Sequence, residues 1–221
     1  MMKVFFKVIL YILLIIFFAL SIYQLGETFY YYVFKDYKAY MWFGIGMGVY
    51  FILRLILNKN KRWFQTFTHE LSHTVVGLMF FRKIHSFRAG EGEGEIYHSG
   101  RYRKNIFISL APYCLPIYTY LFCIIRIICA EEYLYIFDIL LGFTLAFHLT
   151  CFFSQMGAHQ TDIREFGLFT SYVFIFAFMA FNVTIVLLTI QMGLIDAFVC
   201  QFKNFWSDIM VVWERVKLTM N

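Results

Sequence analysis

The chain is organised around residues 63–81, which read Trp-Phe-Gln-Thr-Phe-Thr-His-Glu-Leu-Ser-His-Thr-Val-Val-Gly-Leu-Met-Phe-Phe. His69 and His73 lie four residues apart, so on a helix their imidazoles lie one above the other and can point at one ion. Glu70 projects about 100° around the helix from His69, where its carboxylate can hydrogen-bond a water held on that ion. This is the H-E-x-x-H spacing of zinc hydrolases, with Glu70 as the general base.

The composition is that of an integral membrane protein. Hydrophobic residues make up 61% of the chain and charged residues only 15%, with a mean hydropathy of +0.67, far from the average of soluble domains. The net charge of +5 is carried mainly by short basic clusters at the ends of apolar runs, where positive residues set topology and meet anionic lipid headgroups. We therefore expect the basic clusters to contact a lipid bilayer, and we expect no binding of nucleic acid.

Chance is a weak explanation of the motif. With six His in 221 residues and the Glu content of this chain, a random H-E-x-x-H is expected roughly 0.007 times. The alternative is structural, with the three side chains satisfied by hydrogen bonds inside a helical bundle. Ionisable groups at membrane depth are costly and by default mark a functional site, so the motif favours a zinc site.

The hydropathy pattern predicts an all-α polytopic membrane protein that forms a single domain over residues 1–221. A core of about 63–195 is followed by an interfacial amphipathic helix at about 196–219, and residues 25–38 are predicted to be an interfacial connection. Residues 63–81 are at the lower limit of a span, which favours a partial crossing. About six membrane helices are predicted, at about 4–24, 39–57, 63–81, 105–129, 133–156 and 168–194.

Residues 84–104 do not have a helical pattern. Gly and Glu alternate over 90–95, and on a strand this places carboxylates on one face and bare backbone on the other. We predict a small β-hairpin or strand insertion whose open edge can receive an extended substrate, with Gly92, Gly94 and Ile96 as candidate contacts. The alternative is a flexible polar loop.

Two prolines interrupt the apolar run that follows. Pro112 and Pro116 lie four residues apart, so they should kink or open the helix and free backbone groups that neighbours or water must satisfy. Such a break beside an active site can be functional, with Pro112 as a candidate substrate contact, or it can be a plain packing kink.

A catalytic zinc typically has three protein ligands and an open fourth position, so the two histidines need one more. Asp162 is the first choice, in the polar stretch of residues 157–167, with His159 and Glu165 as rivals in the same stretch. Alternatively, Asp162 only caps the following helix, where aspartate is favoured. His148 is left out, because a lone histidine on an apolar helix is more often a hydrogen-bonded core residue than a ligand.

The cysteines do not suggest a disulfide or zinc framework. They are odd in number, lack C-x-x-C spacing and lie in apolar stretches, so they are expected to be small buried hydrophobes. The five are Cys114, Cys123, Cys129, Cys151 and Cys200.

The chain resembles the site-2 protease family of intramembrane zinc metalloproteases, and within it the compact bacterial branch without extra domains. The resemblance covers residues 63–170. It rests on His69-Glu70-Leu71-Ser72-His73 in a membrane helix, a Gly/Glu-rich strand region ending Tyr97-His98-Ser99-Gly100, a Pro-broken helix and a late aspartate. Two elements differ: Gln160-Thr161-Asp162-Ile163 stands where many members have Leu-Asp-Gly, and Ala111-Pro112-Tyr113 is the nearest substitute for an Asn-Pro-Gly element.

The resemblance implies one Zn²⁺ per chain, bound by His69, His73 and Asp162, with Glu70 activating water. It also implies a multi-pass protein of a bacterial cytoplasmic membrane that hydrolyses a peptide bond in or next to a transmembrane segment of a partner protein, and a hairpin that engages the substrate. Two other functions remain open. One is a membrane regulator that binds partner helices without cutting them, and the other is a zinc hydrolase acting on a lipid-linked substrate.

Overall fold

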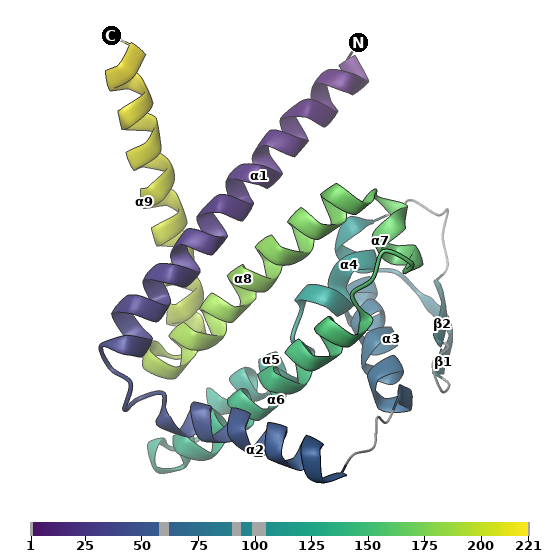
Figure 1. Ribbon diagram of the computed structural model, residues 1–221, viewed down its shortest axis with the longest axis vertical. Helices are drawn as coiled ribbons and strands as arrows, with labels where there is room; N and C mark the ends of the chain where they lie inside the picture. Colours follow the sequence, from purple (N-terminus) through teal and green to yellow (C-terminus); the bar gives the residue numbers. More distant parts are fainter. Residues whose placement is uncertain (1, 58–61, 90–93, 99–104, 221) are drawn as a thin grey trace.

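The computed structural model describes residues 2–57, 62–89, 94–98 and 105–220, and these are nearly all helical (Figure 1). The elements, in chain order, are α1 (Met2–Thr28), the π-helical η1 (Phe29–Phe34), α2 (Met41–Leu57), α3 (Arg62–Met79), β1 (Ile84–Ala89), β2 (Gly94–His98), α4 (Ile106–Cys114), α5 (Ile117–Arg126), the 3₁₀ turn η2 (Glu131–Tyr133), α6 (Leu134–Gln155), α7 (Thr161–Glu165), α8 (Leu168–Met192) and α9 (Leu194–Met220).

Three helical segments of the described residues are long and apolar enough to cross a membrane: Val8–Phe34, Glu131–Gln155 and Leu168–Met192. The pair α4 and α5, bent by 78° at its break, makes a fourth if it is counted as one span. The prediction of about six spans is therefore not confirmed. Helix α2 has 17 residues, which at about 1.5 Å per residue falls short of a bilayer core of about 30 Å. Helix α3 carries too many polar side chains to pass the same test.

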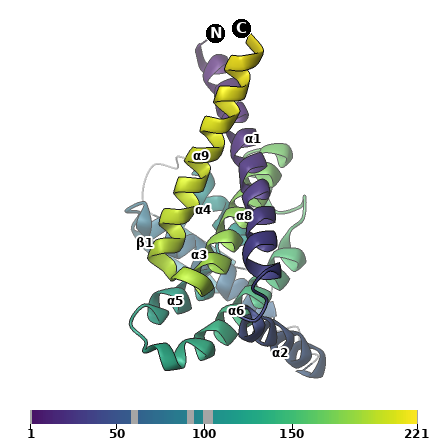
Figure 2. The same cartoon turned by 90° about the vertical axis from the view of Figure 1, so that its left-hand side faces the viewer.

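The N-terminal helix is longer than predicted. Residues 25–38 were expected to form an interfacial connection, but α1 continues as a π-helix to Phe34, because neither proline nor glycine interrupts residues 27–34. At the other end of the chain, α9 is one continuous helix of 27 residues. The outer parts of α1 and α9 extend beyond the rest of the bundle, and both termini lie at the same end (Figure 2).

Helix α8 lies in the middle of the bundle (Figure 1), and α2 packs closely against α6 through one glycine of each helix. A methyl group at Gly46 would overlap the backbone carbonyl of Ile139, and one at Gly142 would overlap that of Phe43. The two helix backbones can approach this closely only because both positions lack a side chain, which is a common way of packing membrane helices.

Replacing Gly142 by alanine should therefore destabilise the protein. The added methyl group must push α2 away from α6, and such overpacking costs about 1–3 kcal/mol of unfolding free energy. Thermal unfolding in detergent measures the loss. Gly44→Ala is the matched control, because a methyl group there meets nothing within 4 Å. Equal unfolding temperatures for the two variants would contradict the close crossing.

Asn182 of α8 forms hydrogen bonds at the break between α4 and α5. Asn182 donates from Nδ2 to the carbonyl of Cys114 at 3.0 Å, and its Oδ1 accepts from the hydroxyl of Tyr120 at 2.6 Å. Helix α4 continues past Pro112 to Cys114, and the chain turns only at Leu115 and Pro116. The carbonyl freed at the break therefore has a donor, as a non-aqueous environment requires.

The strands β1 and β2 pair in antiparallel fashion, with Phe87 opposite Ile96 and Ala89 opposite Gly94. Both strands contact α3, so this two-stranded sheet lies beside the helix that carries the histidine motif (Figure 1). Gly92, the third predicted substrate contact of this segment, lies outside the described residues.

Candidate metal centre

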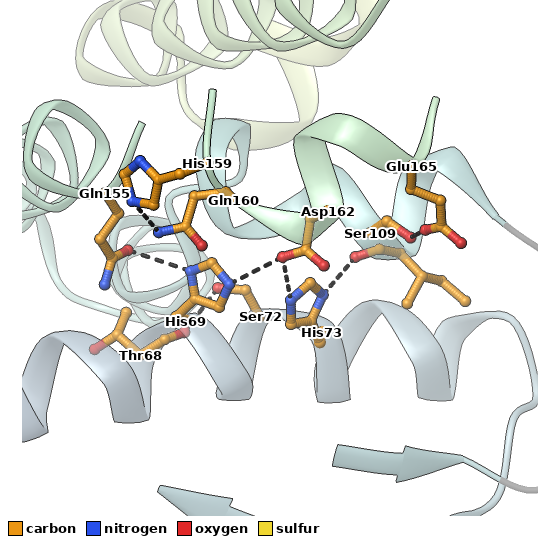
Figure 3. A network of polar contacts seen from close by, with 11 residues as sticks. Thr68, His69, Ser72, His73, Ser109, Gln155, His159, Gln160, Asp162 and Glu165 are labelled. Carbon is orange, nitrogen blue, oxygen red and sulfur yellow. Dashed lines mark hydrogen bonds and ion pairs between the residues drawn. The ribbon is translucent and has the colours of Figure 1, made fainter. Parts of the chain in front are cut away.

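Helix α3 presents His69 and His73 on the side that faces α7, and Asp162 of α7 points back at them (Figure 3). One ring nitrogen of each histidine and one carboxylate oxygen of Asp162 lie within 4.8 Å of one another. Among the described residues this is the one group of three or more His, Cys, Asp or Glu side chains close enough to share an ion. The structure thus brings together the three residues that the sequence analysis selected as ligands.

The short helix α7 is held in place by its neighbours. Ile163 is fully buried, its carbonyl accepts from Ser171 Oγ at 2.7 Å, and Glu165 accepts from Ser109 Oγ at 2.9 Å. The N-cap of α7 is Gln160, without a side-chain capping bond. Asp162 is therefore not the N-cap residue, and its carboxylate faces the histidines instead.

Both imidazole rings are oriented by an oxygen on their far side. His73 Nδ1 lies 2.8 Å from the carbonyl oxygen of Ile108, and His69 Nδ1 lies 3.2 Å from Oε1 of Gln155. Because both partners are acceptors, each Nδ1 carries a proton and donates it. Metal-binding histidines are usually held in this way, which fixes the tautomer and the ring orientation.

The remaining nitrogens converge on one carboxylate oxygen. Oδ2 of Asp162 lies 3.3 Å from Nε2 of His69 and 3.4 Å from Nε2 of His73. Two donor atoms bound at about 2.0–2.1 Å to a tetrahedral zinc are about 3.3–3.4 Å apart. A neutral ring with its proton on Nδ1 offers Nε2 to a cation, whereas a doubly protonated ring donates from Nε2 to Asp162. The spacing and donor types fit zinc.

The electrostatics of the two carboxyl groups differ. Burial by itself raises the pKa of Asp162, but the hydrogen bonds from His69 and His73 and their charge outweigh it, so the pKa lies well below its usual range. Burial raises the pKa of Glu70, and the two imidazoles act in the opposite direction. Asp162 is thus held in its charged form, whereas the pKa of Glu70 is shifted toward the range in which a carboxyl group can take and return a proton.

Access to the site is partial. Glu70 is only 8% exposed, and no hydrogen bond to its carboxylate is found among the described residues. The side chain of Asp162 keeps 25% of its surface exposed. Gln155 is the last residue of α6, so the histidine that it orients lies at one end of a candidate span.

The rivals for the third ligand point elsewhere. His159 is exposed and contacts Gln160 at 3.5 Å, and the carboxylate of Glu165 receives the hydroxyl of Ser109. His148 is buried in α6, apart from the cluster. The five cysteines are free thiols. Gly94 and Ile96 lie on β2 beside α3, and Pro112 is buried in α4, so contact of these three with a substrate stays a prediction.

Two groups of the site were not predicted. Gln155 closes a long apolar run, and its amide at the end of a helix is the kind of signal that could have drawn attention. The role of the Ile108 carbonyl is harder to foresee from the sequence. Its only sign there is Pro112, four residues later. Comparisons of the chain with protein-family models, with curated proteins and with solved structures found no match.

Proposed function

We propose that this chain is an intramembrane zinc metalloprotease that hydrolyses a peptide bond in or next to a transmembrane segment of a partner protein. The observation that carries the proposal is the convergence of His69 Nε2, His73 Nε2 and Asp162 Oδ2 within 4.8 Å, beside Glu70 of the same H-E-x-x-H helix. This donor set, with two imidazoles and one carboxylate, is one that catalytic zinc uses, and it leaves a position for water. The resemblance to the site-2 protease family points to the same chemistry.

A zinc ion held by these three residues supplies Lewis acidity to the scissile carbonyl and to the attacking water. The chain's own residues handle the proton. Glu70 takes one proton from the water as its oxygen bonds to the carbonyl carbon, and returns it to the nitrogen as the C–N bond breaks, so that an acid and an amine leave. Gln155 and the Ile108 carbonyl hold the two rings during this exchange.

The surroundings of the site favour a peptide substrate from the membrane. A transmembrane helix pairs all its backbone groups internally, so a segment of it must unwind before water can attack. The pair β1–β2 lies against α3, and an extended segment can add to such a strand edge through backbone hydrogen bonds. The site also lies at one end of α6, where a substrate helix begins to lose its internal pairing.

The test uses the full chain, purified in detergent and loaded with zinc. A labelled peptide with one transmembrane helix and a lipid-linked ester are offered separately in proteoliposomes. We expect cleavage of the peptide alone. Stoichiometric zinc with no cleavage of any helical peptide would overturn the proteolytic function, and hydrolysis of the lipid-linked compound instead would assign the site to a lipid hydrolase.

A further inference from the structure

The bond from His73 Nδ1 to the Ile108 carbonyl, 2.8 Å long, uses a backbone acceptor that lies inside a helix. Ile108 belongs to α4, Ile106–Cys114. In an α-helix the carbonyl of a residue accepts the backbone N–H of the residue four positions later. For Ile108 that residue is Pro112, which has no N–H to donate.

Helix α4 does not need Pro112 for its shape. The helix continues for two residues beyond the proline, and the bend to α5 comes at Leu115 and Pro116. A proline inside a helix is otherwise strongly disfavoured, so its position four residues after the oriented carbonyl calls for another explanation. The neighbouring side chains of Leu110 and Tyr113 are fully buried, which limits the access of water to this part of α4.

We propose that Pro112 is a positioning residue of the metal centre: by withholding a backbone donor, it leaves the Ile108 carbonyl open to His73, whose ring is then fixed with Nε2 toward Asp162. The inference rests on the metal site described above and does not depend on which bond that site hydrolyses. It assigns Pro112 a task in the site, in addition to the predicted contact with substrate. Losing an outer partner of a metal-binding histidine typically weakens metal binding by about 10–100-fold.

The test compares two replacements at residue 112 in the full chain. Pro112→Ala adds a methyl side chain and an N–H that can bond to the Ile108 carbonyl. Replacement of Pro112 by L-lactic acid, introduced by translation with an α-hydroxy acid, gives the same side chain with an ester oxygen in place of the N–H. The pair therefore differs in the backbone donor, while the side chain is held constant.

Zinc dissociation constants are measured by competition with a chelating dye, and thermal unfolding is followed in the same detergent. We expect Pro112→Ala to bind zinc at least about tenfold more weakly than wild type and to unfold at the same or a higher temperature, because alanine is favoured inside a helix. The lactic acid variant should bind zinc within about threefold of wild type. A merely structural role would lower stability and zinc affinity together.

Three results would overturn the proposal. Equal zinc affinity of wild type and both variants would show that the freed carbonyl is irrelevant, and equal weakening of both variants would assign the effect to the lost pyrrolidine ring. A Pro112→Ala chain that fails to fold would contradict the expected gain of a helix hydrogen bond. Tight zinc binding by a wild-type chain that cleaves no peptide would overturn the proteolytic function and leave this inference standing.

Discussion

Glu70→Gln is expected to reduce cleavage of a transmembrane peptide by about 10²–10⁴-fold, the usual contribution of a general acid–base group, while one zinc per chain remains bound. The carboxamide is nearly the same size as the carboxyl group but cannot take a proton from water. Glu70 projects away from the direction shared by His69 and His73, so its replacement should leave the three ligands in place. Cleavage rates in proteoliposomes and zinc content of the same preparation measure the two effects.

Glu165→Gln is the matched control for this variant. Glu165 lies in the polar stretch near the site, but its carboxylate is engaged by Ser109, so the same chemical change should alter cleavage by no more than a few-fold. If Glu70→Gln cleaved the peptide at the wild-type rate, Glu70 would not be the base. A wild-type chain that binds one zinc but cleaves no transmembrane peptide would instead favour a protein that binds partner helices without cutting them.

Asp162→Asn is expected to weaken zinc binding by at least about 100-fold, above the range for loss of an outer partner. The amide is a poor substitute for the carboxylate, because it removes the negative charge that offsets the metal and can turn its NH₂ group toward the imidazoles. The hydrogen bonds and charge of His69 and His73 outweigh burial and hold the pKa of Asp162 well below its usual range, so the residue is charged near neutral pH. Chelator competition measures the loss.

His159→Ala and Glu165→Gln are the controls for the third ligand, because both residues are chemically able to bind zinc and lie within three residues of Asp162 in the sequence. Both variants should keep the wild-type zinc affinity. Loss of zinc in His159→Ala, with binding retained in Asp162→Asn, would move the third ligand to His159.

The local part of the site could be predicted from the sequence. His69, Glu70 and His73 are one helical turn, so their relation follows from the 3.6-residue period alone. Asp162 is 93 residues from His69, and the sequence offered three candidates within one short stretch. Asp162 and Glu165 both lie on α7, where successive side chains turn by about 100°, so the rotation of this helix decides which of them faces the histidines. That rotation is set by Ile163 in the core and by the bond from Ser109 of α4 to Glu165.

The remaining differences also have physical causes. A break in this helix could be foreseen because proline acts locally, and the structure has it at Leu115 and Pro116. The contact of His73 with the Ile108 carbonyl joins two helices and requires the folded bundle. The prediction of about six spans, which the structure does not confirm, counted α2, which is short, and α3, which carries many polar side chains. Residues 25–34 carry aromatic side chains typical of an interface, yet nothing in them ends the helix.

X-ray absorption at the zinc edge tests the central claim most directly, because it reports the number and type of atoms around the metal in the purified chain. We predict one zinc per chain with only nitrogen and oxygen neighbours at about 2.0–2.1 Å and the outer-shell scattering of two imidazoles. The chain contains six His and five Cys, so other coordination is chemically available. A sulfur neighbour at about 2.3 Å, scattering from more or fewer than two imidazoles, or a purified chain that retains no zinc would contradict the site.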